Sequence, residues 1–166
     1  MLTASSDDEL LAYHAIGLFA GLRMPEIVKF DWHDVNFEKG FIDVGILKAK
    51  TRMRRHAPLT DNLRAWLQPI AKPVGKIISG GLRKRHEAAR EKAGIQWQAN
   101  ILRHSFVSYR LADTQDSAKV ALESGHDQNV LFQHYLHLVT EEDAKRYFNI
   151  RPAADAAGKV VSFSAA

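Results

Sequence analysis

The hydrophobic positions at the start of the chain form one long run. Residues 10–22 are almost entirely apolar and follow three acids at positions 7–9. Acidic side chains favour the first turn of a helix, where the helix dipole is positive. The pattern therefore predicts a buried helix with Ser5 or Ser6 as its N-cap and with Gly21 at its end. Pro25 then fits the first position of a short helix that runs to about residue 30.

From residue 35 the apolar positions shorten into extended segments. Residues 35–37, 41–47 and 54–59 are rich in β-formers and alternate with polar positions, and a turn at residues 38–40 separates the first two. Such alternation predicts a small antiparallel sheet. Residues 48–53 would form the tip of its second hairpin.

The rest of the chain has helical periodicity. Leu102 and Phe106 point toward a core, Gly94 and Gly125 fit left-handed C-terminal positions, and Thr140 resembles an N-cap. The predicted helices cover residues 61–71, 79–93, 100–113, 116–124, 127–136 and 140–149. We therefore expect an α+β fold, mainly α-helical, with a small antiparallel β-sheet near the N-terminal third.

Composition narrows the functional classes. The chain has 166 residues, of which 46% are hydrophobic, and no cysteine, so disulfides, thiolate nucleophiles and cysteine zinc sites are excluded and a reducing cytosolic compartment fits. The apolar run at residues 10–22 is too short to span a membrane and lacks a basic segment before it. We expect one domain over residues 1–152 and a tail over 153–166 that docks on a neighbouring protomer or has no fixed structure.

Basic residues are concentrated in two places. The net charge is +4. One cluster lies at residues 48–55, where no acid interrupts it along the sequence, and the other lies at residues 83–92. Either cluster could be a solvated face or a surface for DNA phosphates. The predicted DNA-binding residues are Lys48, Arg52, Arg54, Arg55, Arg83, Lys84 and Arg85.

The segment around His126 carries candidate chemistry. Gly125 would close one helix and leave His126 at the start of the next, where unpaired N–H groups favour an anion such as phosphate. Tyr135 lies about two turns further and offers a phenol that could attack such a phosphate. A Gly-His junction followed by an aromatic residue is also ordinary helix packing, so this segment alone does not decide between the two interpretations.

Other polar residues stand out from their surroundings. Arg23 follows an apolar helix, and Lys50 lies at the predicted hairpin tip. Asn100 and Arg103 share a helical face and could hold the two oxygens of a phosphodiester. Exposure to water would also explain Arg23, and Asn100 is also a plausible plain N-cap.

The order and spacing of these residues resemble a known family, the tyrosine recombinases or phage integrases. The matching motifs are Gly21-Leu22-Arg23-Met24-Pro25-Glu26, Trp32-His33-Asp34-Val35, Lys50 eight residues before Pro58-Leu59, Asn100-Ile101-Leu102-Arg103-His104, and Ser124-Gly125-His126 followed by Tyr135. Together these motifs cover nearly the whole chain.

The resemblance implies DNA strand breakage and rejoining by a metal-free, ATP-independent enzyme without cofactors. Tyr135 would form a 3′-phosphotyrosyl link while Arg23 and Arg103 clamp the phosphate and His126 donates a further hydrogen bond. Lys50 would protonate the leaving 5′-oxygen. Glu26 would orient Arg23, and His104 would be structural. The site is thus predicted to comprise Arg23, Lys50, Asn100, Arg103, His126 and Tyr135, supported by Glu26 and His104.

The resemblance also implies partners. We expect double-stranded DNA, with four protomers on paired DNA sites and weak association or monomers without DNA. It places the chain in a bacterial or phage-type cytoplasm, associated with the nucleoid and not with a membrane.

The sequence departs from the family pattern at Asn100, where a histidine is usual. An amide cannot take a proton at neutral pH, and a phenol with a pKa of about 10 must lose one. The acceptor would then be His126 or the phosphate. The family clamps DNA between an N-terminal helical domain and the catalytic domain, whereas in this sequence little precedes the first helix of the site. We therefore expect an isolated catalytic domain, cut from a longer chain or encoded alone, with weak DNA affinity.

Other functional classes stay open on sequence alone. A DNA-binding protein of this fold that does not cut would share the basic clusters. A type IB topoisomerase uses related chemistry without choosing a site. His134 and His137 could serve a metal-dependent nuclease, although histidines three residues apart without nearby carboxylates make a weak metal site.

Overall fold

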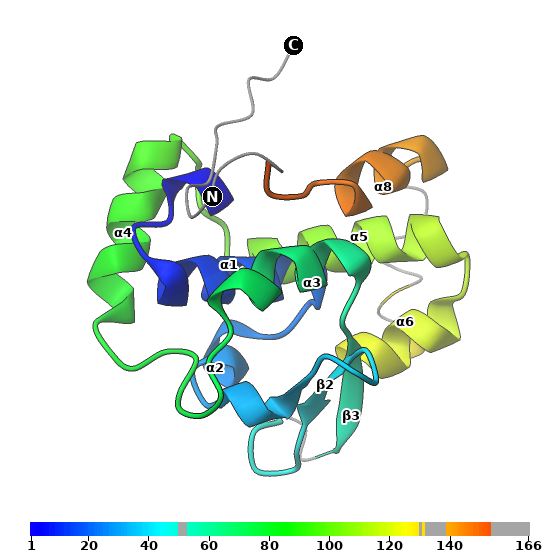
Figure 1. Cartoon of the computed structure of the whole chain (residues 1–166). Coiled ribbons are helices and arrows are strands. Elements are labelled where there is room, and N and C mark those ends of the chain that lie inside the picture. The colour runs from blue at the N-terminus through cyan, green and yellow to red at the C-terminus, as the bar shows by residue number, and fades with distance from the viewer. Residues whose placement is uncertain (50–52, 130, 132–138, 154–166) are drawn as a thin grey trace.

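The computed structural model describes residues 1–49, 53–129, 131 and 139–153 (Figure 1). Its helices are α1 (Asp8–Phe19), α2 (Met24–Ile27), α3 (Asp61–Leu67), α4 (Leu82–Ala93), α5 (Ile101–Thr114), α6 (Ser117–Ser124) and α8 (Glu141–Phe148). Its strands are β1 (Val35–Asn36), β2 (Phe41–Val44) and β3 (Arg55–Pro58), and short 3-10 turns cover Leu2–Ala4, Trp32–Asp34 and Gln68–Ile70. The expected fold class, mainly helical with a small antiparallel sheet, is confirmed.

Helix α1 lies at the centre of the molecule. It packs against α2, α3, α4 and α5, and almost every side chain along it is buried. A helix that is apolar on all sides is stable only inside a core, so the prediction of a buried helix is confirmed. Its N-cap is Asp7, whose carboxylate accepts from the backbone N–H of Leu10 at 3.0 Å. The expected cap at Ser5 or Ser6 was wrong, because Ser6 instead donates to Asp7 at 2.8 Å.

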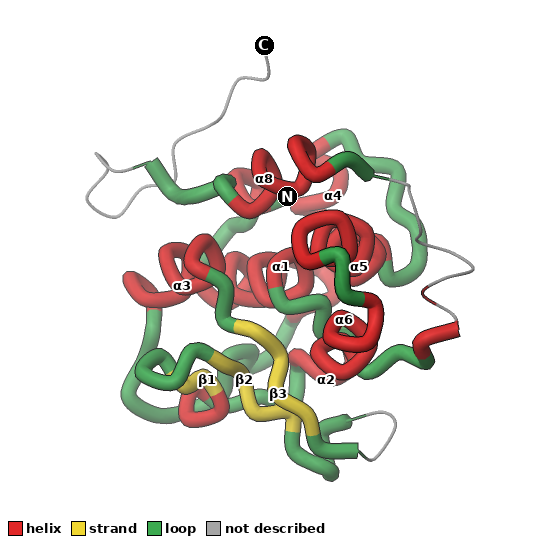
Figure 2. The backbone as a smooth tube through the Cα atoms, turned by 90° about the vertical axis from the view of Figure 1, so that its right-hand side faces the viewer, coloured by secondary structure: helices red, strands yellow, loops and turns green. Residues whose placement is uncertain are grey.

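The sheet has the order β1-β2-β3, and both pairs of strands are antiparallel. Val35 pairs with Ile42, and Ile42 pairs with Ala57. These three side chains are buried, so one face of the sheet packs on the core. Figure 2 shows the sheet below α1 and α3, with β3 next to α6. This contact brings the hairpin to the end of α6, where His126 follows.

Helices α5, α6 and α8 complete the second side of the core. Phe106 of α5 is fully buried in a cluster with Val120 of α6 and with Leu131. Tyr147 of α8 stacks on Tyr109 with ring centroids 4.0 Å apart and donates to the carbonyl oxygen of Leu18 at 2.6 Å. Helix α8 is thereby attached to both α5 and α1.

The predicted helices match the structure with shifts at their ends. Helix α4 begins at Leu82 and not at residue 79, because Gly81 before it has a left-handed φ of 63°. Gly125 has a φ of 68° and closes α6 as predicted. The predicted helix 127–136 begins at Gln128, and most of it lies outside the described residues. None of the helices in the described ranges is long and apolar enough to cross a membrane.

Candidate active site

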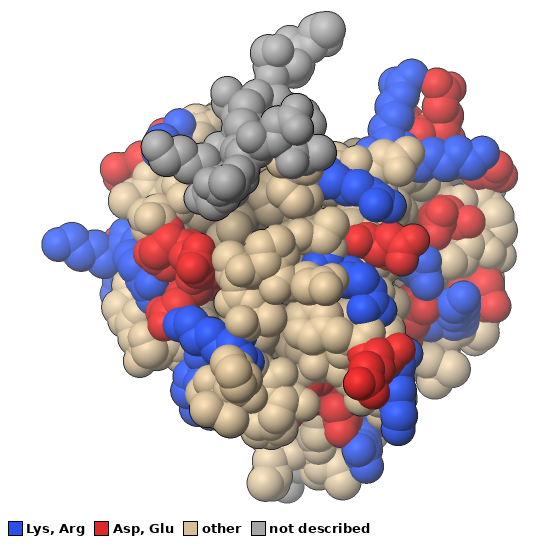
Figure 3. All heavy atoms as spheres, viewed as in Figure 1, with Lys and Arg blue, Asp and Glu red and all other residues tan. Residues whose placement is uncertain are grey.

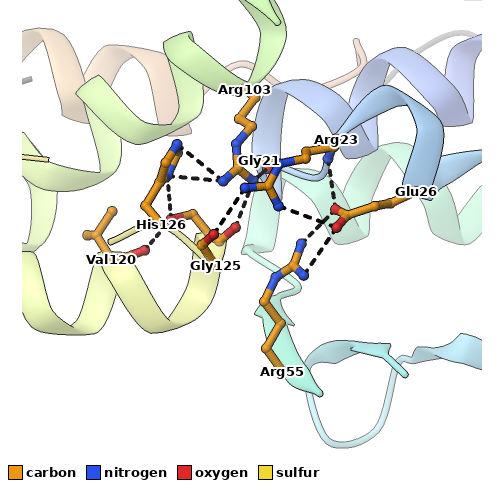
Figure 4. Close-up of polar contacts among 9 residues, drawn as sticks. Gly21, Arg23, Glu26, Arg55, Arg103, Val120, Gly125 and His126 are labelled. Carbon is orange, nitrogen blue, oxygen red and sulfur yellow. Dashed lines mark hydrogen bonds and ion pairs between the residues drawn. The ribbon is translucent and has the colours of Figure 1, made fainter. Parts of the chain in front are cut away.

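Arg103 connects three segments that are far apart in the sequence. It lies in the first turn of α5 and is 4% exposed. Its Nη1 donates to the carbonyl oxygens of Gly21 and Ser124, both at 2.7 Å. Its Nη2 lies 3.1 Å and 3.2 Å from the ring nitrogens of His126 (Figure 4). The guanidinium is therefore held in one orientation by main-chain oxygens from the α1–α2 junction and from the end of α6.

Arg23 approaches the same place from the start of α2. Its Nη2 donates to the carbonyl oxygen of Gly125 at 3.1 Å, and its Nη1 lies 3.4 Å from Glu26 Oε1. Glu26 also accepts from the backbone N–H of Arg23 at 3.1 Å. The guanidinium groups of Arg23 and Arg103 thus meet the His126 imidazole beside Gly125. The Arg23 side chain keeps 18% of its surface exposed, so its guanidinium is open to solvent.

The close approach around Gly21 and Gly125 requires glycine. A Cβ on Gly21 would lie 2.2 Å from the Phe106 ring, and its φ is 63°. A Cβ on Gly125 would lie 3.1 Å from Arg55 Nε. Both positions combine a left-handed backbone with contact to a buried side chain. The two glycines therefore allow the arginines to reach main-chain oxygens.

Glu26 has a second cationic partner, Arg55 of β3. Arg55 Nη2 lies 2.7 Å from Glu26 Oε2 and Nη1 lies 3.3 Å from Oε1, and the two side chains are 7% and 2% exposed. Arg55 was predicted to bind DNA, whereas the structure places it inside, where it joins the hairpin to α2. Strand alternation could have indicated this, since Arg55 shares a face with the fully buried Ala57.

The electrostatic environment keeps the His126 ring neutral. Burial lowers the pKa of His126 to about 3, aided by the positive charges of Arg103 and Arg23 and by the neighbouring His104 and Arg55. The imidazole is therefore uncharged at neutral pH in the chain without DNA. A phosphate placed among these cations would oppose that effect, because an anion favours the charged form of the ring.

Asn100 and His104 lie at the exposed start of α5. Asn100 is the N-cap residue by position, with a left-handed φ of 59° that asparagine tolerates. Within the described residues its side chain makes no capping hydrogen bond. His104 is exposed, and so it does not contribute to the packed core. Leu102 and Phe106 are buried as predicted.

Several predicted site residues cannot be placed. Lys50, Arg52 and Tyr135 lie outside the described residues, as do His134 and His137. Beside His126 the described part of the chain leaves a cavity of about 560 Å³ between the hairpin and α6. Its walls are Met53, Arg54, Arg55, Ala118, Ala121, Leu122, Gly125, His126, Asp127 and Gln128.

Most of the predicted DNA-binding residues have acidic partners, which lie in other segments except for Glu87, the partner of Arg83 within α4. Figure 3 shows basic and acidic side chains interleaved on the face that it presents, without a continuous basic surface. Lys48 pairs with Asp34 and lies 3.7 Å from Asp31, Arg54 binds Asp43 at 2.6 Å, Arg83 binds Glu87 at 3.0 Å, and Arg85 binds Asp7 at 2.8 Å and Glu9 at 3.0 Å. Arg85 thus joins α4 to the start of α1. Lys84 is exposed.

Comparisons with known proteins identify the family of the chain. The sequence model of the phage integrase family matches residues 3–142. The tyrosine recombinases XerC of Azotobacter vinelandii and of Proteus mirabilis are each 29% identical to the chain, over 153 and 154 residues. Each alignment covers 81% of this chain but 50% and 49% of the relative. The chain therefore spans about half the length of the curated relatives it matches.

A solved structure shares the fold. The crystal structure of XerA recombinase superposes with a TM-score of 0.66 at 22% sequence identity, covering 87% of this chain and 58% of the other. The family match covers most of the chain and includes Arg23, Arg103 and His126, which the structure brings together. The chain belongs to the phage integrase family, the tyrosine recombinases.

Proposed function

We propose that this chain breaks and rejoins DNA at specific sites through a 3′-phosphotyrosyl intermediate. The observation that carries the proposal is the meeting of Arg23, Arg103 and His126 around Gly125 from three separate segments. Two guanidinium groups can bind the non-bridging oxygens of one phosphodiester and stabilise the charge that builds there during attack. Family membership supports this reaction class.

The proposed reaction needs a nucleophile, a proton acceptor and a proton donor. The Tyr135 oxygen forms a bond to phosphorus as the bond to the 5′-oxygen breaks. The phenolic proton passes to His126 or to the phosphate, and Lys50 gives a proton to the departing 5′-oxygen. Attack by a 5′-hydroxyl reverses these transfers, so the energy of the phosphodiester is conserved and ATP is not needed.

A nicked suicide duplex tests the proposal. A nick close to the cleavage position lets the short strand that carries the freed 5′-hydroxyl diffuse away, which traps the covalent intermediate. The protein and its Tyr135→Phe variant are incubated in EDTA with a pool of candidate attachment sequences and then separated on a denaturing gel. The proposal predicts an adduct that requires Tyr135. Bound DNA without an adduct from any sequence would favour a DNA-binding protein that does not cut.

Cleavage with and without EDTA, and relaxation of supercoiled plasmid, separate the alternatives that use other chemistry. Among the described residues Asp31, His33 and Asp34 bring potential ligand atoms within 4.8 Å of one another, although Lys48 and Lys76 pair with the carboxylates. Cleavage that EDTA abolishes would point to a metal-dependent nuclease. Relaxation of supercoiled plasmid without sequence preference would point to a type IB topoisomerase.

The expected partners follow from the proposed reaction. Double-stranded DNA is the substrate, and four protomers on paired sites would exchange strands. The chain would act in a bacterial or phage-type cytoplasm as a catalytic domain that binds DNA weakly by itself. Sedimentation with and without a cleaved duplex tests the assembly: a single species of monomer size in both would exclude the proposed tetramer.

A further inference from the structure

Glu26 is shared between two arginines from different segments. Arg55 Nη2 lies 2.7 Å from Glu26 Oε2 and Arg55 Nη1 lies 3.3 Å from Oε1, so the guanidinium contacts both carboxylate oxygens (Figure 4). Arg23 reaches the same carboxylate with its backbone N–H at 3.1 Å and with Nη1 at 3.4 Å. An ionised carboxylate has about four lone-pair sites on its two oxygens. The side chains of Arg55 and Arg23 therefore compete for Glu26.

Arg55 makes the stronger of the two side-chain contacts. A guanidinium that contacts both oxygens of a carboxylate gains energy and a fixed geometry, whereas the Arg23 side chain contributes one long contact. The Arg55 and Glu26 side chains are 7% and 2% exposed, so solvent screens their pair only weakly. Arg23 Nη2 is left to donate to the carbonyl oxygen of Gly125 at 3.1 Å. The Arg23 guanidinium thus stays open to an anion.

Without Arg55, the buried carboxylate would attract the side chain of Arg23. A buried charge that has lost a partner is strongly unfavourable, and Arg23 Nη1 already lies 3.4 Å from Glu26 Oε1. Rotation of the Arg23 side chain would replace this single contact with two and withdraw Nη2 from Gly125. A guanidinium engaged by Glu26 in this way would have fewer N–H groups left for a phosphate.

We propose that Arg55 is a positioning residue for strand transfer, which occupies Glu26 so that the guanidinium of Arg23 stays available to the scissile phosphate. The inference rests on the proposed function, in which Arg23 and Arg103 bind the phosphate oxygens. Arg55 acts from inside the protein, because its side chain is buried and packs against Gly125, where a Cβ would lie 3.1 Å from Arg55 Nε. This role replaces the direct DNA contact that the sequence predicted for Arg55.

A crystal structure of Arg55→Ala tests the inference without DNA. We expect the Arg23 side chain to contact both oxygens of Glu26 and to leave the carbonyl oxygen of Gly125. In Arg55→Ala/Glu26→Gln the neutral amide should not attract Arg23, so Nη2 should return to Gly125. If Arg55→Ala does not fold, Arg55→Lys replaces it, because an ammonium cannot reproduce the planar contact of a guanidinium and leaves one oxygen to Arg23. An Arg23 side chain in its native position in the single variant would overturn the inference.

The rate of adduct formation with the suicide duplex measures the effect on cleavage. Rates are compared in a single turnover at a temperature at which circular dichroism shows each variant to be folded. Arg55→Ala should form the adduct roughly tenfold more slowly, a part of the about 10²–10³-fold that complete removal of one transition-state donor costs. Arg55→Ala/Glu26→Gln should recover most of the native rate, because Arg23 is released.

Arg110→Ala is the matched control. Arg110 also contacts both oxygens of a largely buried carboxylate, with Nε and Nη2 each 2.9 Å from Glu123, and it links α5 to α6. Arg110→Ala should lose stability and still form the adduct at the native rate when folded. Equal slowing in both arginine variants, or no recovery in the double variant, would show that Arg55 acts only through stability and would overturn the inference.

The two measurements also separate the inference from the proposed function. A native chain that forms no adduct with any sequence would count against strand transfer. The crystal structures of the variants would still decide whether Arg55 keeps Arg23 away from Glu26.

Discussion

Replacing Arg55 with alanine should destabilise the chain far more than replacing the adjacent Arg54. Both arginines make two contacts to one carboxylate, but Arg55 and Glu26 are 7% and 2% exposed whereas Arg54 and Asp43 are 64% and 30% exposed. Removing one partner of a buried pair costs about 3–5 kcal/mol, because the other charge is left without compensation. An exposed pair is screened by solvent and contributes little.

The structure places the cost of Arg55→Ala at the lower end of that range. Glu26 would still accept from the backbone N–H of Arg23 at 3.1 Å and lie 3.4 Å from its Nη1. We therefore expect a loss of about 3 kcal/mol, equivalent to a fall in melting temperature of roughly 6–12 °C for a domain of this size.

Urea unfolding at pH 7.5, followed by circular dichroism, measures the two variants. Unchanged m-values would show that the shift in midpoint reports stability and not a change in the unfolded state. An Arg55→Ala midpoint equal to that of the native chain, or a similar loss in Arg54→Ala, would refute the buried bridge between the hairpin and α2.

Three further predictions concern single groups. Gly125→Ala should lower the melting temperature and reduce the adduct yield, because the φ of 68° at this position disfavours a side chain and the new Cβ would press on Arg55. An unchanged melting temperature and yield would show that position 125 accommodates a Cβ. The free energy of unfolding should fall as the pH drops from about 6.5 toward 3. Burial and then His86 lower the pKa of His14 to about 3 in the folded chain, whereas His14 in the unfolded chain takes up a proton from about pH 6.5 downward. His14→Gln should flatten the pH dependence of the urea midpoint, and a curve parallel to that of the native chain would assign the dependence to other groups. Asn100→His should speed single-turnover cleavage; no change would mean that a base is already supplied.

The fold and the candidate motifs could be predicted because their signals are local. The apolar run around α1, the alternation in the strands and the glycine at the end of α6 each report the conformation of the segment that contains them. Arg23, Arg103 and His126 were selected by type and spacing, and the structure brings them together through hydrogen bonds to main-chain carbonyls.

The partners of the charged residues could not be predicted in the same way. The hairpin segment has no acid between Lys48 and Arg55, which favoured a DNA-binding surface. The acids come from elsewhere: Asp34 pairs with Lys48, and Glu26 pairs with Arg55. Pairings between distant segments are set by the fold and not by neighbouring residues.

The position of the covalent bond tests the central claim most directly. The adduct from the suicide duplex is digested with protease and nuclease, and the peptide that retains a nucleotide is sequenced by mass spectrometry. We predict a 3′-phosphonucleotide on Tyr135, with the partly buried Tyr109 and the buried Tyr147 unmodified. A nucleotide on any other residue, or a bond through a 5′-phosphate, would contradict the proposed mechanism.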